Sequence, residues 1–181
     1  DGSFNAGDEK MADITGGDFV DAGQETYAAA IEDERQVMVF EHGAHPGSTL
    51  NLGFEPIALD AGDLDADGMA EIVVISDGDI AVCQVDEGDC EELDTPSGKL
   101  LDVGVGDVDG DILPEVVVLL THNGDVKLQV LNLDYESTVQ VPGYDVEVED
   151  EDSERVAVGD LDGDLVAEIV VLVDGGYGGA I

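Results

Sequence analysis

The sequence predicts an all-β protein built from repeated units of four short strands. Three observations favour this fold class: an acidic segment that recurs along the chain, an apolar β-branched run after each copy, and no sustained apolar period of 3.6 residues. The acidic segment has the pattern Gly-Asp-x-Asp-x-Asp-x-x-x-Glu and occupies residues 62–71, 106–115 and 159–168. Carboxylates at every second position repel one another, so each copy predicts an exposed loop that leads into a buried strand.

A decayed fourth copy precedes these three segments. Residues 17–26 keep the leading Gly-Asp, but Val20 and Ala22 stand where alternating carboxylates are expected. We expect this copy to keep the turn and to lose the metal. The copies are spaced by roughly 45 to 55 residues, close to the range of repeat architectures. The sequence therefore predicts one repeat domain over 1–181, with repeat 1 at about 8–54, repeat 2 at about 55–98, repeat 3 at about 99–143 and a half repeat 4 at about 154–181.

Each repeat is expected to place its loop between the first and the second strand. In repeat 1 the strands are expected at 11–15, 26–31, 37–41 and 49–52, and in repeat 2 at 57–61, 71–76, 80–85 and 90–93. In repeat 3 they are expected at 100–105, 115–121, 126–131 and 137–141, with an Asn-Gly hairpin turn at 123–124. Repeat 4 offers strands only at 155–158 and 168–173.

Four-stranded repeats of this length around an axis are typical of a β-propeller. The predicted fold is therefore a β-propeller or a partial propeller of about three and a half blades. About half of the last blade is missing from the sequence. Either the chain is a fragment of a larger propeller, or strands of another copy complete it, because unpaired strand edges promote aggregation.

Acidic residues dominate the 181-residue chain, with 45 Asp and Glu against 5 Lys and Arg and a formal net charge of −40. This charge excludes nucleic acid and anionic membranes as partners, because both would be repelled. Bound divalent cations would neutralise part of it, and the rest is typical of halophilic adaptation, since salt screens self-repulsion. The acidic run 147–154 is interpreted as a solvated loop rather than a weak cation site.

The two cysteines indicate the compartment. Cys83 and Cys90 have hairpin spacing, so we expect a cross-hairpin disulfide, with two unpaired thiols as the alternative. A disulfide fits an oxidising compartment. No stretch reaches the ~18 apolar residues of a membrane-spanning helix, and no basic segment opens the chain, so any signal peptide is expected to have been removed. We expect a secreted or cell-surface protein.

The acidic loops are predicted to bind about three calcium ions. Counted from the first aspartate, side-chain oxygens fall at positions 1, 3 and 5, a backbone carbonyl at 7 and a carboxylate at 9, which suits the six to eight oxygen ligands of calcium. Glycine at position 4 or 6 lets the backbone turn around the ion. The predicted ligands are Asp63, Asp65, Asp67, the Met69 carbonyl and Glu71 in loop 2; Asp107, Asp109, Asp111, the Leu113 carbonyl and Glu115 in loop 3; and Asp160, Asp162, Asp164, the Val166 carbonyl and Glu168 in loop 4.

Two alternatives compete with this interpretation. An EF-hand begins in the same way, but it ends with a bidentate Glu at position 12 and has flanking helices. Here position 12 is Val74, Val118 or Val171, each inside an apolar run, so the EF-hand is excluded. The other alternative is an acidic turn that carries no ion. All-oxygen ligands favour calcium over zinc or copper, and the loop size disfavours magnesium.

The pattern Gly-Asp-x-Asp-x-Asp-x-x-x-Glu followed by apolar residues resembles the FG-GAP and VCBS-type repeats, as in integrin alpha-subunit propellers. The resemblance covers nearly the whole chain and implies calcium-binding propeller blades. No Phe-Gly precedes the loops, and no Gly-Ala-Pro follows the second strands. These departures favour the microbial, VCBS-like branch over integrin-type ligand binding. The usual family member has seven blades.

No catalytic constellation emerges from the sequence, and we expect no enzyme. His42 and His45 are interpreted as part of a surface turn rather than as metal ligands, and His122 as exposed beside the Asn-Gly turn. The serines show no nucleophile-elbow context. Every convincing carboxylate cluster belongs to an acidic loop.

The sequence thus predicts an extracellular, calcium-stabilised propeller with a structural or adhesive role. One specific version is a head-to-tail filament, in which a neighbouring copy completes the half blade. A second candidate is a ligand- or carbohydrate-binding module of a larger cell-surface protein or enzyme. The candidate partners are accordingly other copies of the chain, a cell-surface protein or a glycan.

Overall fold

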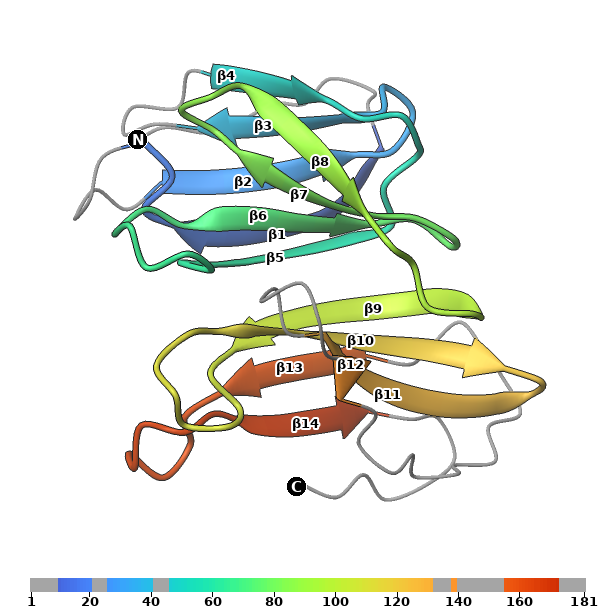
Figure 1. Ribbon diagram of the computed structural model, residues 1–181. Coiled ribbons are helices and arrows are strands. Elements are labelled where there is room, and N and C mark those ends of the chain that lie inside the picture. Colours follow the sequence, from blue (N-terminus) through green and yellow to red (C-terminus); the bar gives the residue numbers. More distant parts are fainter. Residues whose placement is uncertain (1–9, 21–25, 41–45, 132–137, 140–154, 173–181) are drawn as a thin grey trace. The chain divides into compact units, whose positions relative to one another are not determined.

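The computed structural model describes residues 10–20, 26–40, 46–131, 138–139 and 155–172. The chain separates into two compact units, Asp1–Asp94 and Thr95–Ile181, and each contains two antiparallel sheets (Figure 1). The described residues form strands and turns, with no helix among them that could cross a membrane. The all-β prediction is confirmed for this part of the chain.

The first sheet of unit 1 is a four-stranded antiparallel meander. Its strands, in spatial and chain order, are β1 (Met11–Gly17), β2 (Thr26–Ile31), β3 (Gln36–Phe40) and β4 (Pro46–Asn51). β4 begins three residues before the predicted position, because Pro46 pairs with Phe40 across a register shift. Proline is tolerated there as the first residue of an edge strand.

The second sheet of unit 1 repeats this order. Its strands are β5 (Ala58–Gly62), β6 (Glu71–Ile75), β7 (Ile80–Gln84) and β8 (Asp89–Leu93). β6 lies inside the sheet and is buried along its whole length, which explains its continuous apolar run. Cys83 lies opposite Cys90 on β7 and β8 and forms a disulfide with it, so the predicted cross-hairpin bond is confirmed.

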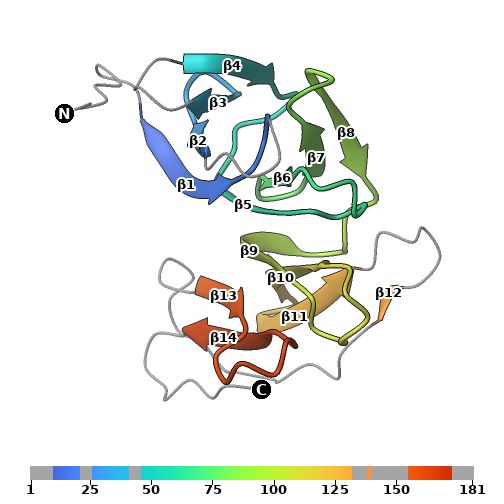
Figure 2. The same cartoon turned by 90° about the vertical axis from the view of Figure 1, so that its left-hand side faces the viewer.

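The core of unit 1 lies between its two sheets, which face each other in Figures 1 and 2. Alternation along the strands sends one side chain in two to this core. The first sheet contributes chiefly Ala28, Ala30, Val37, Val39 and Leu50, and the second Leu59, Ile72, Val74, Ala81 and Cys83. These residues are all at most 3% exposed, so the two sheets bury a shared apolar layer.

Unit 2 is built in the same way. One sheet has the order β12-β11-β10-β9, and the other pairs β13 with β14. The strands are β9 (Lys99–Gly106), β10 (Glu115–His122), β11 (Asp125–Leu131), β12 (Thr138–Val139), β13 (Arg155–Gly159) and β14 (Glu168–Leu172). Val117, Leu119 and Val130 of the first sheet pack with Val156 and Ile169 of the second. The predicted positions of these strands match the structure within about two residues, apart from the fourth strand of repeat 3, described only at Thr138–Val139.

The Asn-Gly hairpin turn is confirmed, because Asn123 and Gly124 both have positive φ values between β10 and β11. His122 is half-buried rather than exposed, since it is the last residue of β10 and pairs with Asp125 across the hairpin. The predictions for His42, His45, the acidic run 147–154 and the second half of the decayed loop concern residues outside the described ones.

In each unit, an aspartate ties the first strands of the two sheets together; Asp102 is buried and Asp13 is half-buried. Leu59 N on β5 donates to Asp13 Oδ2 on β1, at 3.2 Å. Val156 N on β13 donates to Asp102 Oδ2 on β9, at 2.7 Å. Asp13 and Asp102 occupy the same place in their repeats, four residues before the glycine that opens the loop. Both units therefore join their sheets with the same hydrogen bond.

Candidate metal centres

The three acidic loops lie where the sequence places them, between the first and the second strand of a sheet. Loop 2 (63–71) joins β5 to β6, loop 3 (107–115) joins β9 to β10, and loop 4 (160–168) joins β13 to β14. In every case position 9 is the first residue of the second strand. The second strand thus fixes the last carboxylate of the loop in space.

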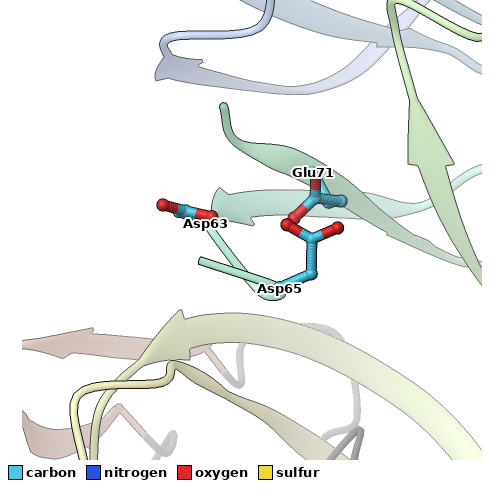
Figure 3. Close-up of side chains that lie close together, drawn as sticks. All are labelled: Asp63, Asp65 and Glu71. Atoms are coloured by element: carbon cyan, nitrogen blue, oxygen red, sulfur yellow. The ribbon is translucent and has the colours of Figure 1, made fainter. Parts of the chain in front are cut away.

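Loop 2 gathers three of its four carboxylates. One oxygen each of Asp63, Asp65 and Glu71 lies within 4.8 Å of the other two. Figure 3 shows the carboxylate of Asp65 beside that of Glu71, with Asp63 on the adjacent part of the loop. Asp67 is outside this group, and its Oδ1 accepts a hydrogen bond from Met69 N at 2.8 Å.

Loop 3 has the same arrangement. Asp107, Asp109 and Glu115 bring one oxygen each to within 4.8 Å of one another. Asp111 is again outside the group and accepts a hydrogen bond from Leu113 N at 2.9 Å. Two loops of different sequence therefore converge on the same geometry at positions 1, 3 and 9.

Loop 4 differs in its third member. Asp160, Asp162 and Asp164 form the group, and Glu168 lies outside it. All three aspartates are exposed, and hydrogen bonds from the N–H groups of Gly163 and Leu165 lower the pKa of Asp160. The carbonyls at position 7, those of Met69, Leu113 and Val166, remain predicted ligands in the three loops.

Backbone N–H groups fold each loop around its first aspartate. Position 6 donates to Oδ2 of position 1 in all three loops, from Gly68 (3.0 Å), Ile112 (2.8 Å) and Leu165 (3.0 Å). This wrapping requires a left-handed backbone at positions 4 and 6. Ala66, Gly110 and Gly163 have φ values of 59°, 83° and 85° at position 4, and Gly68, Ile112 and Leu165 have 93°, 90° and 76° at position 6.

The glutamate at position 9 is held by the N–H of position 2. Leu64 N donates to Glu71 Oε2 at 2.8 Å, and Val108 N donates to Glu115 Oε2 at 2.9 Å. The corresponding bond in loop 4 runs from Leu161 N to Glu168 Oε2 at 2.7 Å. Each bond uses one oxygen of the carboxylate and leaves Oε1 available to a ligand.

Glu71 and Glu115 are the most unusual carboxylates of the described structure. They are 5% and 3% exposed, and no cationic side chain or second hydrogen bond reaches them from any described residue. Burial, reinforced by the neighbouring aspartates, raises the pKa of Glu71 to about 7 and shifts that of Glu115 in the same direction. A buried carboxylate ionises readily only beside a positive charge. The donor set, entirely of carboxylate oxygens, fits a hard divalent cation.

The decayed loop of repeat 1 shows what replaces this arrangement. Position 9 is Thr26, whose hydroxyl accepts from Phe19 N at 3.1 Å and donates to the Gly17 carbonyl at 2.6 Å. Phe19, at position 2, is buried in the core. A neutral hydroxyl with both bonds satisfied thus stands where loops 2 and 3 bury a carboxylate.

Sequence reasoning missed the two inter-sheet aspartates, Asp13 and Asp102. Asp102 is 6% exposed on a strand that is otherwise largely apolar. The sequence does place a single aspartate four residues before the loop glycine in repeats 1 and 3. The backbone N–H of the next repeat that donates to it cannot be identified from the sequence.

Comparison with known proteins concerns the fold. No protein-family model and no curated protein sequence matches the chain. The N-terminal β-propeller of BBS1, in the BBS1N–ARL6DN complex, matches 99% of this chain with a TM-score of 0.67 and 15% identity. The fold is propeller-like. The V. cholerae biofilm matrix protein Bap1 matches 97% of the chain with a TM-score of 0.50 and 16% identity. The chain spans 55% of the BBS1N chain and 32% of the Bap1 chain.

Proposed function

We propose that the chain forms part of an extracellular, calcium-stabilised β-propeller with a structural or adhesive role, of the FG-GAP and VCBS type that its acidic loops resemble. Each sheet corresponds to a blade, and β13 and β14 to the first half of the fourth. Each of loops 2, 3 and 4 holds one calcium ion. The proposal includes no catalytic activity.

The burial of Glu71 and Glu115 carries this proposal. Both side chains turn inward beside two aspartates and have no positive partner among the described residues. An ordinary acidic turn would expose its carboxylates to water, where they are hydrated at no cost. A divalent cation supplies the positive charge that this arrangement lacks. By joining positions 1, 3 and 9, it would tie the first strand of a blade to the second.

Calcium binding should therefore stabilise the fold directly, because the sites exist only in the folded chain. At a calcium concentration of 100 times Kd, each site adds about 2.7 kcal/mol to the free energy of unfolding. Chelation should lower the melting temperature measured by circular dichroism, and calcium should restore it more fully than magnesium at equal concentration. An unchanged melting temperature after chelation would refute the structural role.

A single substitution assigns the effect to the loops. Asp109→Ala should remove one calcium ion from the stoichiometry measured by isothermal titration calorimetry. Asp86→Ala is the matched control, since Asp86 is an exposed aspartate of the β7–β8 turn. Equal stoichiometry in both variants would place the bound calcium elsewhere.

Three observations support an extracellular role in a salt-rich environment. The Cys83–Cys90 disulfide is favoured in oxidising compartments, and calcium is abundant outside the cell. Bap1, which shares the fold, is a biofilm matrix protein. The net charge of −40 suits a salt-rich environment.

The specific form of the structural role is self-assembly of the chain. The sheet face of β13 and β14 that points away from the unit 2 core exposes Val170 and Leu172, the latter at 61%. A neighbouring copy that completes this blade and packs one of its own sheets on this face would cover both side chains. Sedimentation velocity in calcium should show species larger than the monomer, and Leu172→Lys should reduce them. A compact monomer at all concentrations would exclude assembly.

The second candidate is a ligand- or carbohydrate-binding module of a larger cell-surface protein or enzyme. It is favoured because BBS1N is found in complex with a protein and because the chain spans only part of both neighbours. The sequence that flanks this chain in its gene separates the candidates. Further catalytic or anchoring domains there would favour the module.

A further inference from the structure

One peptide group joins loop 3 to loop 4. The carbonyl of Asp107 accepts a hydrogen bond from Ala167 N at 2.6 Å, and the N–H of the same peptide, on Val108, donates to Glu115 Oε2 at 2.9 Å. Ala167 immediately precedes Glu168. A continuous relay therefore runs from the buried glutamate of loop 3, through the 107–108 peptide, to the residue beside the last carboxylate of loop 4.

Close packing reinforces this relay. A Cβ placed on Gly106 would lie 3.1 Å from the Ala167 Cβ, and one on Gly110 would lie 3.1 Å from the Val166 Cγ2. The glycines at these positions thus let loop 4 approach the backbone of loop 3. The two loops cannot rearrange independently near Asp107.

Unit 1 contains the same relay with a different end point. Ala70 N donates to the Asp18 carbonyl at 3.0 Å, and the following N–H, on Phe19, donates to the hydroxyl of Thr26 at 3.1 Å. Loop 2 is therefore connected to the decayed loop, which has a neutral threonine at position 9. In loop 3 position 8 is Pro114, which has no N–H to donate. Within the described part of unit 2, the relay joins two intact acidic loops, 3 and 4.

We propose that calcium binds loops 3 and 4 with positive cooperativity. The inference rests on the proposed calcium sites. A cation in loop 3 draws Glu115 and Asp107 around it and fixes the 107–108 peptide, so that the acceptor for Ala167 N is already in place. Loop 4 then loses less conformational freedom on binding its own ion.

A thermodynamic cycle measures the coupling in the full chain. Asp65→Ala removes site 2 and leaves sites 3 and 4, while Asp65→Ala combined with Asp162→Ala or Asp109→Ala leaves site 3 or site 4 alone. Calorimetric titration with calcium gives the association constants. The overall association constant for two calcium ions in Asp65→Ala should exceed the product of the single-site association constants of the two double variants by at least about fivefold. Equality of these quantities would overturn the proposal. The absence of calcium binding in the Asp65→Ala chain would instead refute the calcium sites themselves.

A second variant tests the relay. Ala167→Pro removes the donor N–H and reproduces the proline that loop 3 carries at the same position. In the Asp65→Ala background it should leave two calcium ions bound with no cooperativity. Ala70→Pro, the same change in repeat 2, should leave the coupling of loops 3 and 4 intact. Cooperativity that persists in folded Ala167→Pro would contradict the relay, and the thermodynamic cycle decides the coupling even if this variant does not fold.

Discussion

At the scale of the residue, the molecule depends on carboxylates in unlike surroundings. Most acidic side chains of the described residues are exposed, but Glu71 and Glu115 are enclosed by the strands that they begin. Asp13 and Asp102 use their carboxylates as acceptors for backbone N–H groups. The same functional group therefore serves as a candidate metal ligand in one place and as a structural tie in another.

The raised pKa of Glu71, about 7 against an ordinary 4.5, predicts opposite pH effects with and without calcium. In the metal-free chain the protonated form is favoured by folding, so this contribution to stability is complete below about pH 4.5 and is lost as the pH rises through 7. With calcium the ionised form is needed, so affinity should fall as the pH drops below 7.

Melting temperatures between pH 5 and pH 8, compared for wild type and Glu71→Gln, measure this effect. Without metal, the variant should gain stability relative to wild type as the pH rises. A constant difference between the two proteins over this range would contradict the assignment to Glu71.

The left-handed backbone at position 6 provides a second prediction. Ile112 has a φ of 90°, a conformation that β-branched residues avoid. Its side chain is 85% exposed, so packing contacts offset little of this strain. Ile112→Gly should stabilise the chain by about 1 kcal/mol in urea denaturation, because such strain costs about 1–3 kcal/mol and glycine returns part of that as chain entropy. The reciprocal change, Gly68→Ile in loop 2, should destabilise it. If Ile112→Gly and Gly68→Ile changed the free energy of unfolding equally, backbone strain at position 6 would be excluded.

At the scale of the element, the sequence predicts the positions of the strands but not which loop carboxylates come together. The runs after each loop are β-branched and apolar, and they predicted β6, β10 and β14 within about one residue. Positions 1, 3 and 9 converge in loops 2 and 3, whereas Asp67, Asp111 and Glu168 lie outside the groups. Whether a carboxylate joins the group depends on which backbone N–H groups donate hydrogen bonds to it. The alternating acidic pattern alone does not encode these hydrogen bonds.

The tie between β9 and β13 can be tested by a pair of substitutions. Asp102→Ala leaves the buried N–H of Val156 without its acceptor and should cost about 1–3 kcal/mol of unfolding free energy. Asp102→Asn keeps a carbonyl oxygen at this place and should lose less. Urea denaturation measures both, and identical losses would show that the hydrogen bond is not the cause.

At the scale of the whole molecule, the net charge of −40 is spread over repeats that share one construction. Self-repulsion at this charge opposes the compact state, and salt screens it over about 10 Å at 0.1 M. The melting temperature of the metal-free chain should therefore rise between 0.05 and 2 M sodium chloride, with a smaller rise in calcium. The same result in potassium chloride would identify screening, and a flat response would contradict it.

The β7–β8 hairpin shows a further use of this charge. β8 lies at the edge of its sheet, where its backbone groups face outward, and Asp89, Glu91 and Glu92 along it are exposed. A chain that added a strand here would have to bring its own acidic surface against three carboxylates. The disulfide between Cys83 and Cys90 also holds β8 against β7. The edge of β8 is thereby protected against pairing with a strand of another chain.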